Sequence, residues 1–216
     1  MQTELTNTDI IRFLKTKTSG AGFIDSLKIK YRSLICPFIS LLKMVKPGEK
    51  VGDVGCGSGQ FLLLVNEFAK PSYLYGIEIN NILIENANEL FSTFHQSSYN
   101  FEEYDGSIFP PKMAEMDVIF LIDVYHHVPK QGRQEFIQNL VKKMKPGCRL
   151  IFKDVDASSP LVYVNKLHDL IFAQEIGNEI SFEKAKSLLI DNGLQIIEQE
   201  KRTTYVYPHY TIVAKK

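Results

Sequence analysis

Three glycines alternate with other residues in the run Val51-Gly52-Asp53-Val54-Gly55-Cys56-Gly57-Ser58-Gly59-Gln60-Phe61. The run joins a short apolar segment, which predicts a strand, to a strongly apolar segment at 61–70, which predicts a helix. Glycine carries no Cβ atom, so such a turn bends sharply and lets a ligand touch the main chain, while the helix behind it offers unpaired N–H groups. The sequence therefore predicts that a nucleotide-like ligand binds at this turn.

The spacing of the glycines distinguishes two kinds of nucleotide-binding turn. Dinucleotide enzymes use Gly-x-Gly-x-x-Gly, whereas enzymes that bind S-adenosylmethionine (SAM) use an acid followed by Gly-x-Gly-x-Gly. Here the third glycine comes one residue too early for the first pattern, Gln60 stands where that glycine belongs, and Asp53 precedes the glycines. The spacing favours SAM.

Length and composition indicate one globular domain. A chain of 216 residues buries about 70% of its unfolded surface, and 44% hydrophobic and 23% charged residues are ordinary globular values. No apolar run reaches the roughly 18 residues of a transmembrane helix, and the first residues lack the pattern of a secretory signal. We expect a cytoplasmic protein without a membrane span.

Cysteine usage and charge exclude further classes. Cys36, Cys56 and Cys148 are widely separated and odd in number, which indicates neither a disulfide framework nor a zinc site. The 25 basic and 25 acidic side chains give no net charge and form no dense basic block, so we expect no nucleic-acid partner.

The order of the predicted elements indicates a doubly wound α/β sheet behind an N-terminal helical cover at 1–45. The core at 46–216 alternates strands and helices. The predicted strands begin at Lys50 and lie at 73–79, 99–104, 117–123, 149–155, 194–204 and 210–215, and the predicted helices lie at 61–70, 81–91, 130–144, 160–172 and 181–193. Because the last two strands are joined by the short segment 205–209, the final strand is expected to run antiparallel.

Acidic residues mark the carboxyl ends of the first five predicted strands, where ligands of such sheets collect. They are Asp53, Glu78, Asp105, Asp123 and Asp154, the last preceded by Lys153. Any one of them reads equally well as a helix cap or a solvated turn, but five together are hard to explain as capping.

Two of these acids fit an adenosine ligand. Glu78 lies 25 residues after Asp53 and suits a ribose diol, a role that dinucleotide enzymes also require, so it does not choose between the two kinds of turn. Asp105, followed by Gly106 and Ser107, is placed to accept from the exocyclic amine of adenine, with a backbone N–H reaching a ring nitrogen.

Five successive motifs carry a resemblance to a known family. They are Val-Gly-Asp-Val-Gly-Cys-Gly-Ser-Gly, Gly-Ile-Glu-Ile-Asn, Tyr-Asp-Gly-Ser, Leu-Ile-Asp-Val-Tyr-His-His-Val-Pro and Met-Lys-Pro-Gly-Cys-Arg-Leu, in the family's order within roughly residues 45–216. On these motifs the chain resembles the class I SAM-dependent methyltransferases. One departure is Gly52, where the family usually has a large aliphatic residue.

The resemblance implies a seven-stranded, mostly parallel sheet in the order 3-2-1-4-5-7-6, with SAM as methyl donor and S-adenosylhomocysteine as product. Tyr31-Arg32 near the start of the chain has two equally good interpretations. The arginine either brings a guanidinium to the SAM carboxylate or lies on a solvated helix face. The expected cofactor-binding residues are Arg32, Asp53, Gly55, Cys56, Gly57, Glu78, Ile79, Asp105, Gly106, Ser107 and Asp123.

Methyl transfer from a sulfonium needs an aligned nucleophile, exclusion of water and, where the nucleophile carries a proton, a base. A histidine titrating near neutral pH suits that task. His126 and His127 follow the fourth strand, and adjacent residues entering a helix cannot both face a pocket. The resemblance favours His126 as the base, with Lys153 and Asp154 as further catalytic candidates.

The acceptor pocket is expected at the sheet edge that holds the cofactor, under a cover formed by the N-terminal helices and the helix after the fifth strand. Its candidates are Tyr31, His127, His168, Tyr205, Tyr207 and His209, although His168 also fits a core histidine and the hairpin side chains also fit an exposed tip. Asp123, Asp154 and Asp156 make a metal site conceivable, but the sequence predicts none.

The sequence thus predicts methylation at oxygen or carbon of a small or amphipathic acceptor, such as a lipid-like substrate, by a monomer or homodimer. A catalytically silent SAM-binding sensor or partner subunit is the alternative. A nicotinamide dehydrogenase is the third possibility, and its cofactor would bind in place of SAM.

Overall fold

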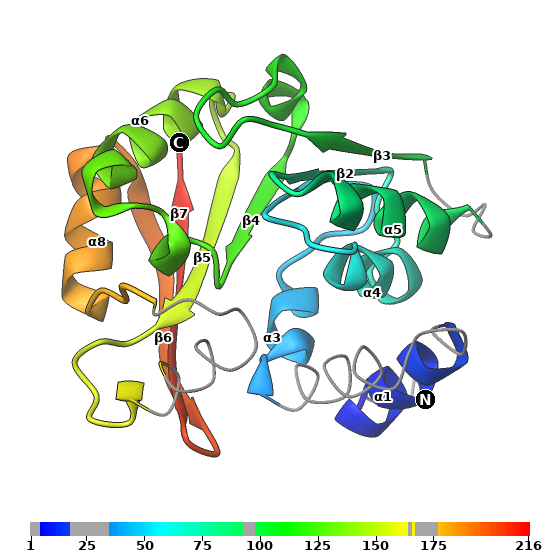
Figure 1. Cartoon of the computed structure of the whole chain (residues 1–216), viewed down its shortest axis with the longest axis horizontal. Coiled ribbons are helices and arrows are strands. Elements are labelled where there is room, and N and C mark those ends of the chain that lie inside the picture. Colours follow the sequence, from blue (N-terminus) through cyan, green and yellow to red (C-terminus); the bar gives the residue numbers. More distant parts are fainter. Residues whose placement is uncertain (1–4, 18–34, 93–97, 164–165, 167–176) are drawn as a thin grey trace.

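The computed structural model describes residues 5–17, 35–92, 98–163, 166 and 177–216. In these ranges one sheet has the strand order β3-β2-β1-β4-β5-β7-β6 (Figure 1). The neighbours from β3 to β5 pair in parallel, and β7 runs antiparallel to both β5 and β6. The strands are β1 (Lys50–Val54), β2 (Tyr73–Glu78), β3 (Ser98–Glu103), β4 (Val118–Ile122), β5 (Arg149–Val155), β6 (Gln195–Thr204) and β7 (Tyr207–Lys215). The predicted fold class, strand order and antiparallel last strand are confirmed.

Helices cover both faces of the sheet, as Figure 1 shows. The α-helices are α1 (Asn7–Lys17), α3 (Phe38–Lys43), α4 (Gln60–Phe68), α5 (Asn81–Phe91), α6 (Arg133–Lys143) and α8 (Phe182–Asp191), with 3-10 turns η1 (Pro111–Glu115), η2 (Tyr125–His127) and η3 (Lys130–Gly132). One apolar cluster joins α1, α3, α4 and α5 to one face, and a second joins η1, α6 and α8 to the other. Because both faces are covered, all five residues of β4 are buried. No helix in the described ranges combines the length and apolarity that crossing a bilayer requires.

Helix α4 is enclosed on two sides, which explains its composition. Its residues from Phe61 to Asn66 are all buried, whereas a helix on the surface of a sheet buries only one stripe. The outer side packs against the N-terminal helices: the ring centroids of Phe13 and Phe68 are 5.4 Å apart, and those of Phe38 and Phe61 are 6.0 Å apart. This packing seats the helix that begins at the glycine turn.

The unusual Gly52 is compensated by two methionines. A Cβ atom at Gly52 would lie 3.0 Å from Met116 Cγ and 3.5 Å from Met113 Cε, and both methionine side chains are fully buried. Side chains from η1 and from the residue that follows it therefore fill the space that a large aliphatic residue would occupy in β1.

Two predicted elements differ from the observed ones. The connection expected at 205–209 is shorter than predicted, because β7 begins at Tyr207. The strand pairs with β6 from Tyr207 onward and with both β5 and β6 from His209 onward. Tyr207 and His209 are consequently strand residues, and only Tyr205 and Val206 separate the strands. The helix expected over 130–144 is divided, because η3 covers its first residues and α6 begins at Arg133. Most of the helix expected over 160–172 lies outside the described residues.

Candidate active site at the carboxyl end of the sheet

The glycine turn between β1 and α4 has the left-handed backbone that its composition requires. Gly55, Gly57 and Gly59 have φ angles of 72°, 53° and 76°, and Gly59 caps α4. The N–H groups of Gly55 and Cys56 donate to the carbonyl of Ile77 over 2.8 Å and 3.1 Å, which fastens the turn to β2.

Two of the glycines face different surroundings. A Cβ atom at Gly55 would lie 2.4 Å from Val124 Cγ2, so the turn is packed tightly against the segment after β4. A Cβ atom at Gly57 would have no heavy atom within 4 Å. The backbone at Gly57 is therefore open to a ligand, while the backbone at Gly55 is part of the packed interior.

The other predicted residues of the first strand and the turn lie inside the protein. Asp53 is 3% exposed and Cys56 is 4% exposed. The sulfur of Cys56 lies 2.7 Å from the position that a Cβ atom of Gly76 would take, so the thiol packs on the sheet. Cys56 contributes its backbone N–H to the turn rather than its side chain to a ligand.

Glu78 at the end of β2 is held by backbone donors. Its Oε2 accepts from Gly57 N over 3.1 Å, and its Oε1 accepts from Ile79 N over 2.8 Å and from Asn80 N over 3.3 Å. A carboxylate offers about four acceptor positions, so capacity remains for one further hydroxyl donor, and the long Asn80 bond is the easiest to exchange. Glu78 is thus oriented before any ligand binds.

Asp105 forms a tight turn with the residues that follow it. Its Oδ1 accepts from Ile108 N, Ser107 N and Ser107 Oγ over 2.7 Å, 2.8 Å and 3.0 Å. These bonds, the Ile108 backbone bond foremost, lower the pKa of Asp105. Its Oδ2 accepts no bond from the described part of the chain, so this oxygen is available to a ligand.

Exposed aliphatic side chains accompany these two acids. Ile79 is 62% exposed and Ile108 is 70% exposed, and the backbone of Gly106 lies against Ile79, since a Cβ atom there would be 3.6 Å from Ile79 Cγ2. Branched side chains exposed beside oriented acids suit a flat ring with polar edges. Sequence reasoning missed Ile108, although its place three residues after Asp105 was a usable signal.

Asp123 and Lys153 pair with each other at the ends of β4 and β5. Lys153 Nζ donates to both carboxylate oxygens of Asp123, over 2.6 Å and 2.7 Å. The lysine side chain is 1% exposed and the aspartate side chain 26% exposed. Burial alone would raise the pKa of Asp123, but the Lys153 ammonium holds that pKa well below its usual range. Asp123 is the first residue after β4 and has a left-handed φ angle of 55°.

His126 and Asp154 form a second buried pair. His126 Nδ1 lies 2.6 Å from Asp154 Oδ1, the His126 backbone N–H donates to Asp154 Oδ2 over 3.2 Å, and the side chains are 3% and 1% exposed. His127 is exposed, with its ring centroid 4.1 Å from that of His126. The structure thus separates the two histidines into one buried and one exposed side chain.

Arg133, which the sequence did not single out, fixes the loop that carries this pair. Its guanidinium donates to the carbonyls of Val128 (2.9 Å), His126 (3.1 Å) and Asn178. Asn178 N also donates to the His126 carbonyl over 2.9 Å. One side chain at the start of α6 therefore ties the segment after β4 to the segment before α8.

His209 on β7 is buried beside the Asp123–Lys153 pair. It is 3% exposed, and its Nε2 lies 2.9 Å from the carbonyl oxygen of Ile35. Burial and the nearby Lys153 charge lower its pKa to about 4, which keeps the ring neutral at neutral pH. Tyr207 is also buried and stacks on His209 with ring centroids 6.2 Å apart, whereas Tyr205 at the hairpin tip is 75% exposed.

The remaining candidates, Tyr31, Arg32 and His168, lie outside the described residues.

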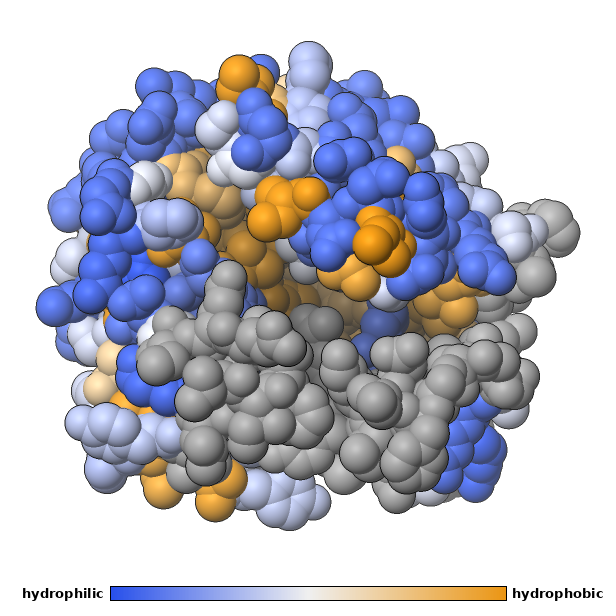
Figure 2. Space-filling view, viewed as in Figure 1, coloured by the Kyte–Doolittle hydropathy of each residue, from blue (hydrophilic) through white to orange (hydrophobic). Residues whose placement is uncertain are grey.

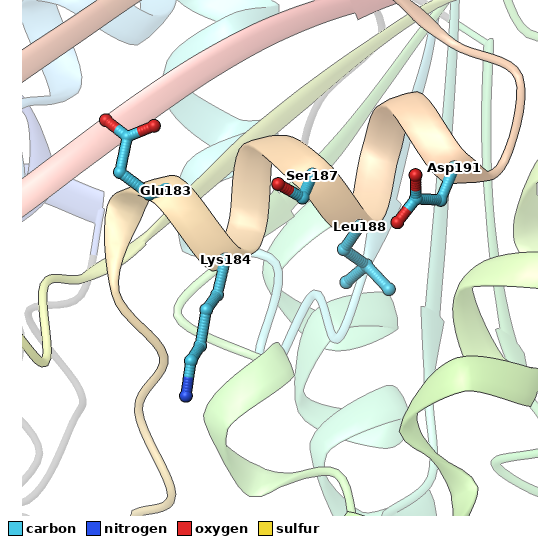
Figure 3. Close-up of a pocket in the computed structure, with 5 residues that line it drawn as sticks. All are labelled: Glu183, Lys184, Ser187, Leu188 and Asp191. Atoms are coloured by element: carbon cyan, nitrogen blue, oxygen red, sulfur yellow. The ribbon is translucent and has the colours of Figure 1, made fainter.

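A depression on α8 is separate from the strand-end residues described above. Figure 2 shows a hollow near the centre of one face, with apolar side chains along its upper border. The depression on α8 is bordered by Glu183, Lys184, Ser187, Leu188 and Asp191 (Figure 3). All five belong to one helix, and none is a strand-end acid. Because ligand sites draw groups from several elements, we assign this depression no role.

Three comparisons place the chain among known proteins. The family described as "Methyltransferase domain" matches residues 28–199. An O-methyltransferase of Pyrenophora dematioidea is 25% identical over 174 residues, which are 79% of this chain and 63% of that protein. This chain therefore spans less than two thirds of the length of that curated relative.

Two solved structures share the fold at low sequence identity. A SAM-dependent methyltransferase of Methanosarcina mazei has a TM-score of 0.67 and 17% identity, covering 82% of this chain and 96% of its own. The magnesium protoporphyrin IX methyltransferase of Synechocystis PCC 6803 with bound S-adenosylhomocysteine has a TM-score of 0.70 and 19% identity, covering 99% and 95%.

Proposed function

We propose that this chain, which belongs to the methyltransferase family, transfers the methyl group of SAM to an oxygen or carbon atom of a small or amphipathic acceptor. The observation that carries the proposal is the glycine turn, whose backbone at Gly57 is open while its N–H holds Glu78 in place. The O-methyltransferase of Pyrenophora dematioidea and the bound S-adenosylhomocysteine in the Synechocystis structure support the same chemistry.

The residues at the ends of β1, β2 and β3 fit SAM. The remaining acceptor capacity of Glu78 suits a ribose diol, and the open Oδ2 of Asp105 suits the amine of adenine. Ile79 and Ile108 provide exposed apolar surface for the ring, and the open backbone at Gly57 leaves room for the methionine portion. Bound SAM supplies a methyl group already activated by its sulfonium, so the protein has only to place the acceptor and manage a proton.

The His126–Asp154 pair is the proposed proton acceptor. Asp154 accepts the Nδ1 proton, which makes Nε2 the basic nitrogen of the ring, and its carboxylate would stabilise the imidazolium that forms. Arg133 holds the backbone of the same loop and is a positioning residue for this pair. Lys153, already paired with Asp123, would act as a hydrogen-bond donor rather than as a base.

Labelled methyl transfer tests the proposal. The protein is incubated with SAM carrying a labelled methyl group and the small-molecule extract of its source cell. We expect label in an extracted compound, release of S-adenosylhomocysteine, and loss of both with His126→Ala at unchanged SAM affinity. SAM binding without label transfer into any extracted compound would favour the silent sensor, and no SAM binding would reject the proposal.

A further inference from the structure

His209 carries a hydrogen-bond acceptor that nothing in the described structure uses. A carbonyl oxygen can only accept, so the 2.9 Å contact with Ile35 requires the proton on Nε2. In the neutral ring Nδ1 is then an acceptor, and it has no partner among the described residues although the side chain is 3% exposed. Leaving a buried polar atom without a partner is unfavourable, so a ligand that supplies a donor there gains affinity.

Lys153 offers a donor on the same face of the sheet. In the register of β5 and β7, Lys153 lies opposite Thr211, and Val155 lies opposite His209. Side chains alternate along a strand, so Lys153 and His209 project from one face as diagonal neighbours. Two of the three ammonium N–H groups suffice for the oxygens of Asp123, which leaves one donor.

This face is the one that the N-terminal helices cover. Ile151 and Val213, which alternate with Lys153 and Thr211, belong to the apolar cluster of α1, α3 and α4, and Ile35 lies just before α3. The Asp154 side chain points to the opposite face, where its strand neighbours Phe152 and Tyr210 pack with α6 and α8. The donor and acceptor thus form a group separate from the His126–Asp154 pair.

We propose that His209 Nδ1 and Lys153 Nζ together bind a hydroxyl group of the methyl acceptor, which deepens the proposed function and rests on it. A hydroxyl donates one hydrogen bond and accepts others, so it satisfies the imidazole nitrogen and the ammonium at once. The acceptor class is therefore an alcohol or phenol. A site built to bond a hydroxyl rejects an analogue that lacks it, because the buried groups are then left unpaired.

The first test observes the nitrogen directly and needs no turnover. In histidine-15N-labelled protein loaded with S-adenosylhomocysteine, phenol is the probe. We expect the Nδ1 resonance of His209 to move in a saturable way as phenol is added, with Nε2 nearly unchanged. The same titration with benzene, which has no hydroxyl, is the control. A Nδ1 resonance that does not move with phenol, or that moves equally with benzene, would overturn the inference.

The second test uses two replacements of His209, each of which places an amide group near a different nitrogen of the original ring. His209→Asn places an amide near Nδ1 and loses the Ile35 contact, whereas His209→Gln places an amide near Nε2 and can keep that contact. With the source-cell extract as acceptor pool, we expect the half-saturating extract concentration to rise about tenfold or more for Gln and clearly less for Asn. The reverse order would mean that only the Ile35 contact matters. Calorimetric affinity for S-adenosylhomocysteine is expected to match the wild type in both variants.

The two proposals fail in different ways. Absence of labelled product with the wild-type protein counts against the proposed function, and the phenol titration still decides the inference. Normal label transfer with an immobile Nδ1 resonance counts against the inference alone.

Discussion

The two halves of the sheet edge are built in opposite ways. At the ends of β1, β2 and β3, backbone N–H groups orient the acids Glu78 and Asp105, and part of each carboxylate stays available. At the ends of β4 and β5, by contrast, side chains pair with one another, Asp123 with Lys153 and His126 with Asp154. The first half is set by local chain geometry, whereas the second depends on pairs that are 30 and 28 residues apart.

The largest expected effect breaks the buried ion pair. Lys153→Met leaves the Asp123 carboxylate without its partner, and we expect the free energy of unfolding to fall by about 3–5 kcal/mol. Urea denaturation measures the loss. Lys145→Met is the matched control, because the Lys145–Asp117 pair is 38% and 37% exposed and such pairs contribute about 1 kcal/mol or less. Equal losses would show that burial does not distinguish the two pairs.

The second effect is the loss of stability at low pH that His209 is expected to cause. The pKa of this histidine is about 4 in the folded protein against 6.5 for the ordinary side chain, so between these values the unfolded chain binds more protons. The stability that the neutral His209 contributes is therefore fully present above pH 6.5 and is lost as the pH falls toward 4. The free energy of unfolding is expected to fall by about 3 kcal/mol in all over this range.

Comparison with His209→Asn isolates this contribution, since asparagine does not titrate. We expect the difference in unfolding free energy between wild type and variant to shrink from pH 7 to pH 4 in denaturation series. A constant difference across that range would show that His209 is not held neutral by its surroundings.

The third effect separates two glycines of the turn. Alanine is strained at both Gly55 and Gly57, where φ is positive, by roughly 1–2 kcal/mol. Only at Gly55 does the added Cβ also meet Val124, at 2.4 Å. We expect Gly55→Ala to lower the thermal unfolding temperature more, and Gly57→Ala to act mainly by weakening SAM binding. Equal melting temperatures would contradict the packing described for Gly55.

The same contrast explains what the sequence could predict. The glycine turn, Glu78 and the Asp105 turn are local patterns, and the fold follows from the alternation of strands and helices with the short final connection. The Asp123–Lys153 pair, the His126–Asp154 pair and the Ile35 contact of His209 join separate elements, so the residues could be named but not their partners. Arg133 was missed because its bonds go to backbone carbonyls, which no side-chain pattern reveals.

The position of Gly52 illustrates the same limit. Gly52 departs from the family pattern, yet Met113 and Met116 fill the space beside it from a segment more than 60 residues away. Compensation of this kind depends on the folded arrangement of η1 beside β1.

Calorimetric titration of the purified protein with S-adenosylhomocysteine and with NAD tests the central claim most directly. We predict saturable binding of S-adenosylhomocysteine, no binding of NAD, and an affinity for S-adenosylhomocysteine about tenfold weaker in Glu78→Gln, because hydrogen bonds to a charged acceptor contribute about 1.5–3 kcal/mol. Binding of NAD with no binding of S-adenosylhomocysteine would contradict the account.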